Sequence, residues 1–498
     1  MSAACMVFDL VSNVTVVAHF PTSRGLTIAL LKSYVGIGSS IIGTVRLAFF
    51  MNPTHFFYFL FALSVATAIV LASVLRLPSY HLTGYEVKHL PQEVKEQRLA
   101  TKAQYLRQRV PKWGQVYLFV LLLVSIVYLL VASASTTYLA LGPAYKKGFA
   151  IASIALALLV LVLCFPLHRV GPPRRDDADD EDLFDEPRHD AIEPSFAEER
   201  GGASEAGRVA APKETNIDYI APQYQTTFRQ SLLTLRFWAI IWTLFCLTGT
   251  EFTVIFYSSY IYGAINGKQT SDDMRTLLSV LNGAGSAVGR LLIALFEHVT
   301  QNRPPEQRIA VTWAPMIPSA FMTIALVLFL TLPPAALPLA FIILAFANGS
   351  QAAMTALVPR TIYAKDAAKH YQFQFISCIL SAIVLVRYLY AEWYNRLGVK
   401  NGNPNGYCFG RSCILMPFCV QLGLVCSTYV SNLYVCWRYA QYSRRVLAER
   451  ARIVGEPRSS VDGEDAPKKE QQVVGEPFPL SLREISEDLA DDSESERK

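Results

Sequence analysis

Residues Phe20 to Gly43 read FPTSRGLTIALLKSYVGIGSSIIG and join a short turn to an apolar helix that carries charge. One apolar segment ends at Phe20, a turn containing proline and Arg24 follows, and a second apolar segment begins at once. At roughly 100° per residue, five small or charged residues fall in one stripe roughly 80° wide. They are Lys32, Gly36, Ser39, Gly43 and Arg46. A membrane helix gathers such residues on one side when that side faces protein or water.

The composition of the whole chain fits a membrane setting. Its 498 residues are 52% hydrophobic and only 17% charged, whereas soluble proteins carry about 25% charged residues. The apolar residues cluster in runs of about 20, the length that crosses a bilayer core of about 30 Å. The net charge of +5 does not indicate a nucleic-acid partner. No CxxC pair is present, so we expect no structural zinc site and no cofactor.

By the length rule we predict about eleven spanning segments and an all-α polytopic membrane protein. The segments are 3–20, 25–50, 54–76, 115–138, 147–168, 237–263, 273–298, 309–332, 335–357, 368–391 and 413–437. Lys and Arg concentrate in alternate connections, at 77–114, after 168, at 299–308, at 358–367 and after 437. These connections lie on one side if the helices alternate, and the positive-inside rule makes that side cytosolic. The C-terminus is then cytosolic as well.

The opening stretch also resembles a known family. FPTSRG followed by LLKSYVGIGSSII is similar to the loop and fifth helix of nodulin-like members of the major facilitator superfamily, with pattern FPxSRGxxxGxLKxYxGLSxAI. The likeness returns at NGAGSAVGR (Asn282 to Arg290) and ANGSQAAM (Ala347 to Met354). The resemblance implies a transporter of two helical bundles that works by alternating access. It also implies that the first three helices of the family are missing here.

On this basis we expect six regions along the chain. They are the second half of an N-terminal bundle (1–76), a basic cytosolic connector (77–114), an extra transmembrane helix pair (115–170), an acidic disordered cytosolic linker (171–235), a C-terminal six-helix bundle (236–440) and a disordered cytosolic tail (441–498). The connector suits either a helix at the anionic leaflet or a solvated joint.

Charged and polar residues inside spanning segments are the candidates for a substrate or ion pathway, because a charge in the bilayer is costly unless it is paired or hydrated. Asp9 and Lys32 lie at similar depths, so we expect them to pair or to share a cavity, with Asn13 one turn from Asp9. A structural ion pair between adjacent helices is the alternative.

Three further candidates lie in the C-terminal half. Glu251 could bind a proton or cation during transport, or could be a protonated group bonded to a neighbouring helix. Asn348 and Gln351 could line the cavity or could hold helices together.

A second group is assigned to gating and helix packing. Glycines permit close helix contact, and the resemblance implies that Arg290 latches a cytosolic gate with an acidic partner, for which Glu297 is available. The group comprises Arg24, Gly36, Gly43, Gly285, Gly289 and Arg290. Cys408 and Cys413 are either a disulfide in an external loop or two free thiols.

The function implied by the resemblance is secondary transport of a small polar solute, either an organic anion, an amino acid or a metal species. The alternative is a truncated, non-transporting membrane scaffold or assembly subunit. It arises because a half bundle would expose Lys32 and Arg46 to lipid unless partner helices cover them. The chain has no GxxxxGK[ST], HExxH or GxSxG motif, so we do not expect an enzyme. The sequence leaves both the plasma membrane and an internal organelle membrane open.

Overall fold

The computed structural model describes residues 11–12, 15–16, 19, 24–50, 52–80, 86, 89–101, 112–139, 141–164, 222–301, 309–402 and 406–455. Asp9, Asn13 and the predicted disorder of 171–221 and 456–498 lie outside these residues, as does the side chain of Arg24. Within them the protein is almost entirely helical, with no strand.

Nine helices of the described chain are long and apolar enough to cross a membrane, which makes this an all-α, multi-pass membrane protein. They correspond one to one to the predicted segments from 54–76 onward. They are α3 (Pro53–Val74), α7 (Lys112–Tyr138), α8 (Pro143–Leu159), α11 (Leu235–Asn266), α12 (Asp272–Gln301), α13 (Met316–Thr331), α14 (Leu337–Ile362), the consecutive α15 (Ala367–Phe373), α16 (Phe375–Ser381), η6 (Ala382–Ala391) and α17 (Glu392–Lys400), and α18 (Ser412–Gly455). The predicted segment 25–50 is α2 (Arg24–Phe49).

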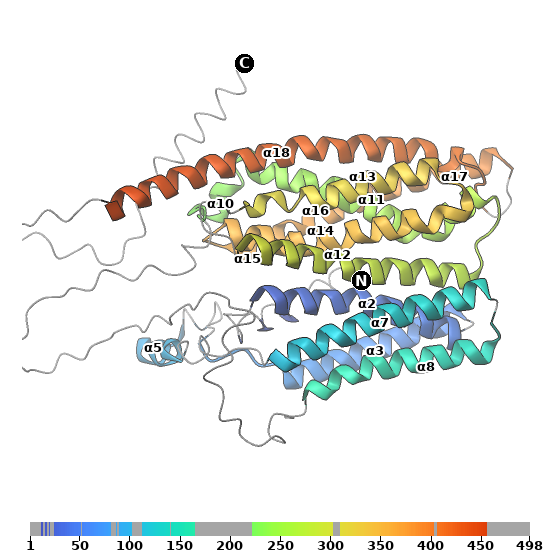
Figure 1. The fold of residues 1–498 in the computed structure, drawn as a ribbon, viewed down its shortest axis with the longest axis horizontal. Helices are drawn as coiled ribbons and strands as arrows, with labels where there is room; N and C mark the ends of the chain where they lie inside the picture. Colours follow the sequence, from blue (N-terminus) through green and yellow to red (C-terminus); the bar gives the residue numbers. More distant parts are fainter. Residues whose placement is uncertain are drawn as a thin grey trace, which may run out of the picture.

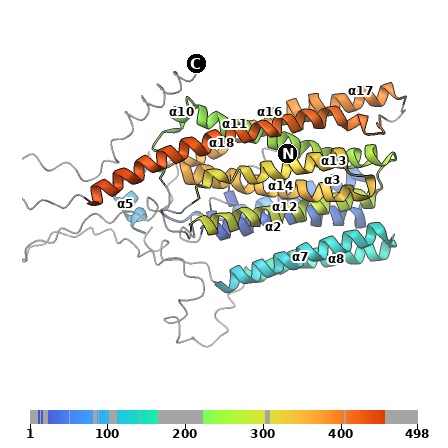
Figure 2. The ribbon, with the colours of Figure 1, turned by 45° about the horizontal axis from the view of Figure 1, so that its top comes forward.

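The helices run roughly parallel or antiparallel, and α12 occupies a central place among them (Figure 1). It packs along α14 on one side and along α2 on the other, while α11, α13, α14 and α18 enclose the larger hydrophobic core. The turned view shows α7 and α8 together on the side of α2 that faces away from α18 (Figure 2).

Of the predicted extra pair, α7 is packed into the molecule, whereas α8 lies against α2 and α7 with only Ala150 and Ser153 buried. A second core joins α2, α7 and α12, with Leu30 and Ile37 of α2 against Leu122 and Leu129 of α7. The Tyr34 hydroxyl donates a hydrogen bond to the Leu118 carbonyl at 2.8 Å, which fixes α2 against α7. Helix α3 is the opposite case, because it has no buried residue at all.

The helix formed by α16, η6 and α17 departs from α-helical geometry where it packs against a kink in α11. Residues Ala382–Ala391 form a π-helix, and Tyr257 of α11 has non-helical φ and ψ of −110° and 20°. The rings of Tyr390 and Tyr257 lie 5.0 Å apart at this level. Roughly two turns before Tyr257, Gly249 leaves room on α11 for the Leu385 side chain.

The last part of the predicted linker, Pro222 to Leu235, is ordered, because an aromatic residue anchors it to the bundle. Tyr224 is 4% exposed, and its main chain bonds on both sides of Tyr363, to the Ile362 carbonyl and the Ala364 amide at 2.8 and 3.0 Å. The Arg236 guanidinium lies 3.8 Å from the Tyr224 ring centre. The helix α10 (Phe228–Ser231) follows this anchor.

Two helices extend past their predicted ends. The predicted segment 368–391 continues through α17 to Lys400, where Arg396 donates to Glu392 at 2.8 Å, an i,i+4 pair that supports a helix outside the apolar zone. Helix α18 continues to Gly455, so residues 441–455 are helical where the sequence predicted the start of a disordered tail.

Asp366, in the turn between α14 and α15, provides a pH-dependent contact. The Lys369 ammonium at 2.7 Å and the Phe228 amide at 3.3 Å both donate to its carboxylate and hold its pKa below the usual value. A lowered pKa means that this stabilisation is present above the unfolded-state pKa of about 3.9 and is lost as the pH falls through the lowered value. We therefore expect Asp366→Asn to reduce thermal stability modestly at pH 7, and to have no effect at pH values below the lowered pKa.

The measurement is the unfolding temperature of both proteins between pH 3 and pH 8. Asparagine tolerates the left-handed conformation of this residue, whose φ is 54°, so the backbone is not strained by the change. A difference that stays constant over the whole range would contradict the assignment.

Candidate functional site at the centre of the helix bundle

Helices α2 and α12 touch through their main chains. A methyl group added at Gly36 would lie 2.9 Å from the Gly283 carbonyl oxygen, closer than real side chains approach. Hydroxyls of α2 bond across the contact, from Ser33 to the Ala287 carbonyl at 3.3 Å and from Ser40 to the Val280 carbonyl at 3.4 Å. This small-residue contact, which we call the α2–α12 seam, explains why glycine and serine recur in α2.

The polar stripe predicted on α2 coincides only in part with the seam, because its member Gly36 makes the close main-chain contact to α12. The buried residues Ser33, Ile37 and Ser40 are centred roughly 100° around the helix from Lys32. Lys32 itself is 6% exposed, whereas Ser39 in the same stripe is exposed and Gly43 is half-buried. At the level of Lys32, therefore, α12 of the same chain covers the stripe.

Glycines of α12 also face α14. A methyl group at Gly289 would lie 2.8 Å from the Ser350 amide nitrogen and 3.1 Å from the Gly349 Cα, and one at Gly285 would meet the Ala345 methyl. Asn348 of α14 donates to the Asn282 side-chain oxygen of α12 at 3.2 Å. Asn348 is therefore engaged between two packed helices.

Three of the predicted residues converge near the middle of the bundle. The Gln351 amide of α14 donates to the Thr248 hydroxyl of α11 at 2.6 Å, and Glu251 follows one turn after Thr248. Arg290 of α12 is 8% exposed and close enough for its charge to act on the Glu251 carboxylate. We call Thr248, Glu251, Arg290 and Gln351 the central polar cluster.

Arg290 also reaches across the seam, where its Nη1 donates to the Lys32 main-chain carbonyl of α2. Glu297, the acidic partner available from the sequence, forms a 2.6 Å ion pair with Arg360, near the last turns of α12 and α14. Arg290 thus bonds the main chain of α2, and a separate ion pair ties α12 to α14.

One residue near the central polar cluster was not predicted from the sequence. Cys378 of α16 lies close to both Thr248 and Glu251. A cysteine in an apolar run gives no signal of its own, since it usually behaves as a small apolar residue. Thr250, which the spacing places beside Glu251, turns away and bonds the Cys246 carbonyl of its own helix at 3.0 Å.

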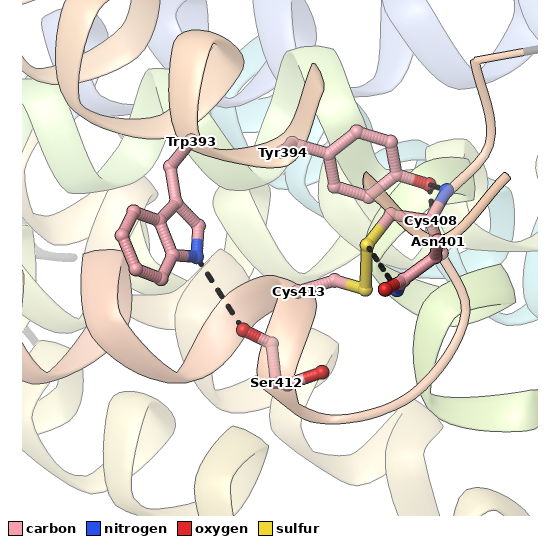
Figure 3. Close-up of a disulfide and its surroundings, with 6 residues drawn as sticks. All are labelled: Trp393, Tyr394, Asn401, Cys408, Ser412 and Cys413. Atoms are coloured by element: carbon pink, nitrogen blue, oxygen red, sulfur yellow. Dashed lines mark hydrogen bonds between the residues drawn. A yellow bond between two sulfur atoms is a disulfide. The ribbon is translucent and has the colours of Figure 1, made fainter. Parts of the chain in front are cut away.

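At one end of the bundle a disulfide joins Cys408, in the loop before α18, to Cys413 in the first turn of that helix (Figure 3). The Cys408 amide donates to the Tyr394 hydroxyl at 3.0 Å, and the Trp393 indole donates to the Ser412 carbonyl at 3.4 Å. The Gly410 amide bonds the Ala264 carbonyl at the end of α11 at 2.8 Å. The loop therefore joins the ends of α11, α17 and α18.

Removing this disulfide is expected to lower the free energy of unfolding by about 2 kcal/mol, because a closed loop this short restricts the unfolded chain only moderately. The test is the unfolding temperature of Cys408→Ser with Cys413→Ser, compared with Cys426→Ser, which changes an exposed cysteine of α18. Equal stability of the double variant and the Cys426 control would show that the crosslink does not hold the loop.

No protein-family model matches the chain, and no curated protein sequence matches it either. The family resemblance therefore rests on the quoted stretches alone. Of the predicted pathway residues, Gln351 bonds Thr248, one turn from Glu251, and the Lys32 main-chain carbonyl accepts a hydrogen bond from Arg290. The predicted pairing of Lys32 with Asp9 lies outside the described residues.

Proposed function

We propose that this protein is a secondary transporter of a small polar solute, related to the nodulin-like branch of the major facilitator superfamily. The central polar cluster carries the proposal. Glu251 lies near the middle of the 32-residue helix α11, one turn from Thr248, which accepts a hydrogen bond from the Gln351 amide of α14, and Arg290 of α12 is buried in the same bundle. Ionisable groups so placed mark substrate or ion pathways in membrane proteins.

The α2–α12 seam supports the movement that such a transporter needs. Gly36 and Gly283 place main chain against main chain, so the two helices can rock without large side chains interlocking. Arg290 crosses this seam from the central polar cluster. A change of charge at the cluster therefore has a direct route to the contact between the two halves of the molecule.

The disulfide supports a proposed orientation. Disulfides persist on the oxidising side of a membrane, so the end that holds Cys408 and Cys413 faces the exterior or an organelle lumen. Helix α18 starts at that end and runs to the other, which supports the proposal of a cytosolic C-terminus. The positive-inside rule gives the same orientation from the Lys and Arg residues alone.

The experiment is transport by the purified full chain in liposomes, screened against organic anions, amino acids and metal species under an imposed pH gradient. At least one solute should move, and Glu251→Gln should abolish its uphill accumulation because a neutral amide cannot carry a proton. Glu392→Gln, which changes an exposed carboxylate of α17, is the matched control. A folded protein that moves none of the solutes would contradict the proposal and favour the scaffold alternative.

A further inference from the structure

We infer that the end of the molecule that holds the disulfide opens between α8 and α12, and that an ion pair between Lys146 and Asp273 keeps it closed. The Lys146 ammonium of α8 lies 2.5 Å from the Asp273 carboxylate of α12, and the two side chains are 21% and 28% exposed. We call this pair the outer latch. Its role in transport rests on the proposed function, and the inference goes beyond that function by naming where the outer mouth lies and which contact closes it.

The first step places the outer latch at the same end as the disulfide. Gly410, between the two bonded cysteines, donates to the Ala264 carbonyl near the end of α11. Asp273 is the second residue of α12, which follows α11 after a short connection. Lys146 lies in the first turn of α8, just after the turn that joins α7 to α8. The outer latch therefore lies at the end that the proposed orientation turns toward the exterior or an organelle lumen.

The second step concerns how easily this contact can separate. Helix α8 packs against α2 and α7, and it reaches α12 through the ion pair at its first turn. The Thr137 hydroxyl, near the end of α7, adds a hydrogen bond to the Asp273 main-chain carbonyl at 3.2 Å. A partly exposed ion pair adds little net stability, because water competes for both charges. The outer ends of α7 and α8 can therefore move away from α12 while the α2–α12 seam stays closed.

The third step is a buried polar group behind the outer latch. Ser133 of α7 lies one turn before Thr137 and shares its face of the helix. Its side chain is 3% exposed, and its hydroxyl has no hydrogen-bond partner in the part of the chain that the structure describes. Leaving a buried hydroxyl without a partner costs free energy. Opening of the outer latch gives this hydroxyl water or a passing solute as a partner, which offsets part of the cost of breaking the ion pair.

The test is the rate at which a maleimide labels Ser133→Cys in the detergent-purified full chain, read by mass spectrometry of the peptide that carries position 133. Labelling of a buried thiol follows the population of the open state. Adding Lys146→Gln should make labelling roughly two- to fivefold faster, the ratio that matches the usual strength of a partly exposed ion pair. Lys147→Gln, which changes the exposed neighbouring lysine, is the matched control and should leave the rate unchanged. Exchanging the charges, with Lys146→Asp and Asp273→Lys together, should restore slow labelling.

Two further measurements separate a local opening from unfolding. The native Cys246, buried in α11, reports global unfolding in the same samples, and its labelling rate should not change. Hydrogen exchange of the amides of residues 134–138, compared between wild type and Lys146→Gln, gives the result without the reporter cysteine. Exchange in that segment should be faster in the variant by a similar factor.

The possible failures are distinguishable. An unchanged rate at position 133 in Lys146→Gln, or a fast rate that the charge exchange does not slow, would overturn the outer latch. An equal rise at position 133 and at Cys246 would show unfolding of the whole protein and would overturn the local opening. Faster labelling in a protein that moves no solute in liposomes would overturn the proposed function and leave the opening in place. Transport with unchanged labelling would do the reverse.

Discussion

Replacing Gly289 by valine is expected to destabilise the protein by about 3 kcal/mol, the upper end of the usual cost of overpacking a well-packed core. The added carbon would meet the Phe346 carbonyl, the Ser350 amide and the Gly349 Cα of α14. All three are main-chain atoms, which cannot rotate away as the end of a side chain can. The helices α12 and α14 would have to separate, and they form one of the most extensive helix contacts of the structure.

The matched control is Gly423→Val on α18, where an added carbon meets nothing within 4 Å. Each variant replaces a helical glycine by valine, so the intrinsic helix propensity changes equally in the two. The measurement is the unfolding temperature of the purified proteins in one detergent. Similar unfolding temperatures for the two variants would contradict the close contact between α12 and α14.

Replacing Arg290 by lysine is expected to slow transport roughly 10- to 100-fold, the equivalent of losing one charge-assisted hydrogen bond of about 1.5–3 kcal/mol. Arg290 bonds the Lys32 carbonyl while its charge acts on Glu251, and a lysine keeps the charge but has no planar fork to serve both directions. The variant should fold, because the buried charge and the long apolar stem are retained.

Initial transport rates in liposomes, with equal amounts of folded protein, give the comparison. Arg396→Lys is the control, since Arg396 pairs with Glu392 on the exposed surface of α17. A rate for Arg290→Lys within a factor of about two of wild type would show that a point charge is enough at this position and that the fork has no role.

The spanning helices could be predicted because a run of about 20 apolar residues is typical of a helix that crosses a membrane. Their packing could be predicted only in part. The glycines of α12 indicated close contacts, but they divide between two neighbours, Gly283 toward α2 and Gly289 toward α14. Spacing along one helix states which residues share a face and does not state which partner that face meets.

The central polar cluster shows the same limit. Glu251, Arg290 and Gln351 could each be selected because a charge or an amide in an apolar run is unusual. Their positions along the chain do not indicate that they lie in one region of the fold. The anchor at Tyr224 could not be predicted at all, because its order comes from Tyr363, Arg236 and the main chain of a distant turn. A short segment without apolar periodicity reads as disordered until its partners are known.

The π-helix has a consequence for how this chain tolerates changes of length. Leu385 and Tyr390 both face α11, five residues apart, whereas regular α-helical geometry would place them roughly 140° apart. Wider i to i+5 turns bring them to one side, so the stretch holds a surplus residue relative to an α-helix. A single-residue deletion between 382 and 391 would therefore shorten the helix without moving its tyrosine-rich end out of register. An inserted residue there would add a second surplus residue and would shift the register of the helix.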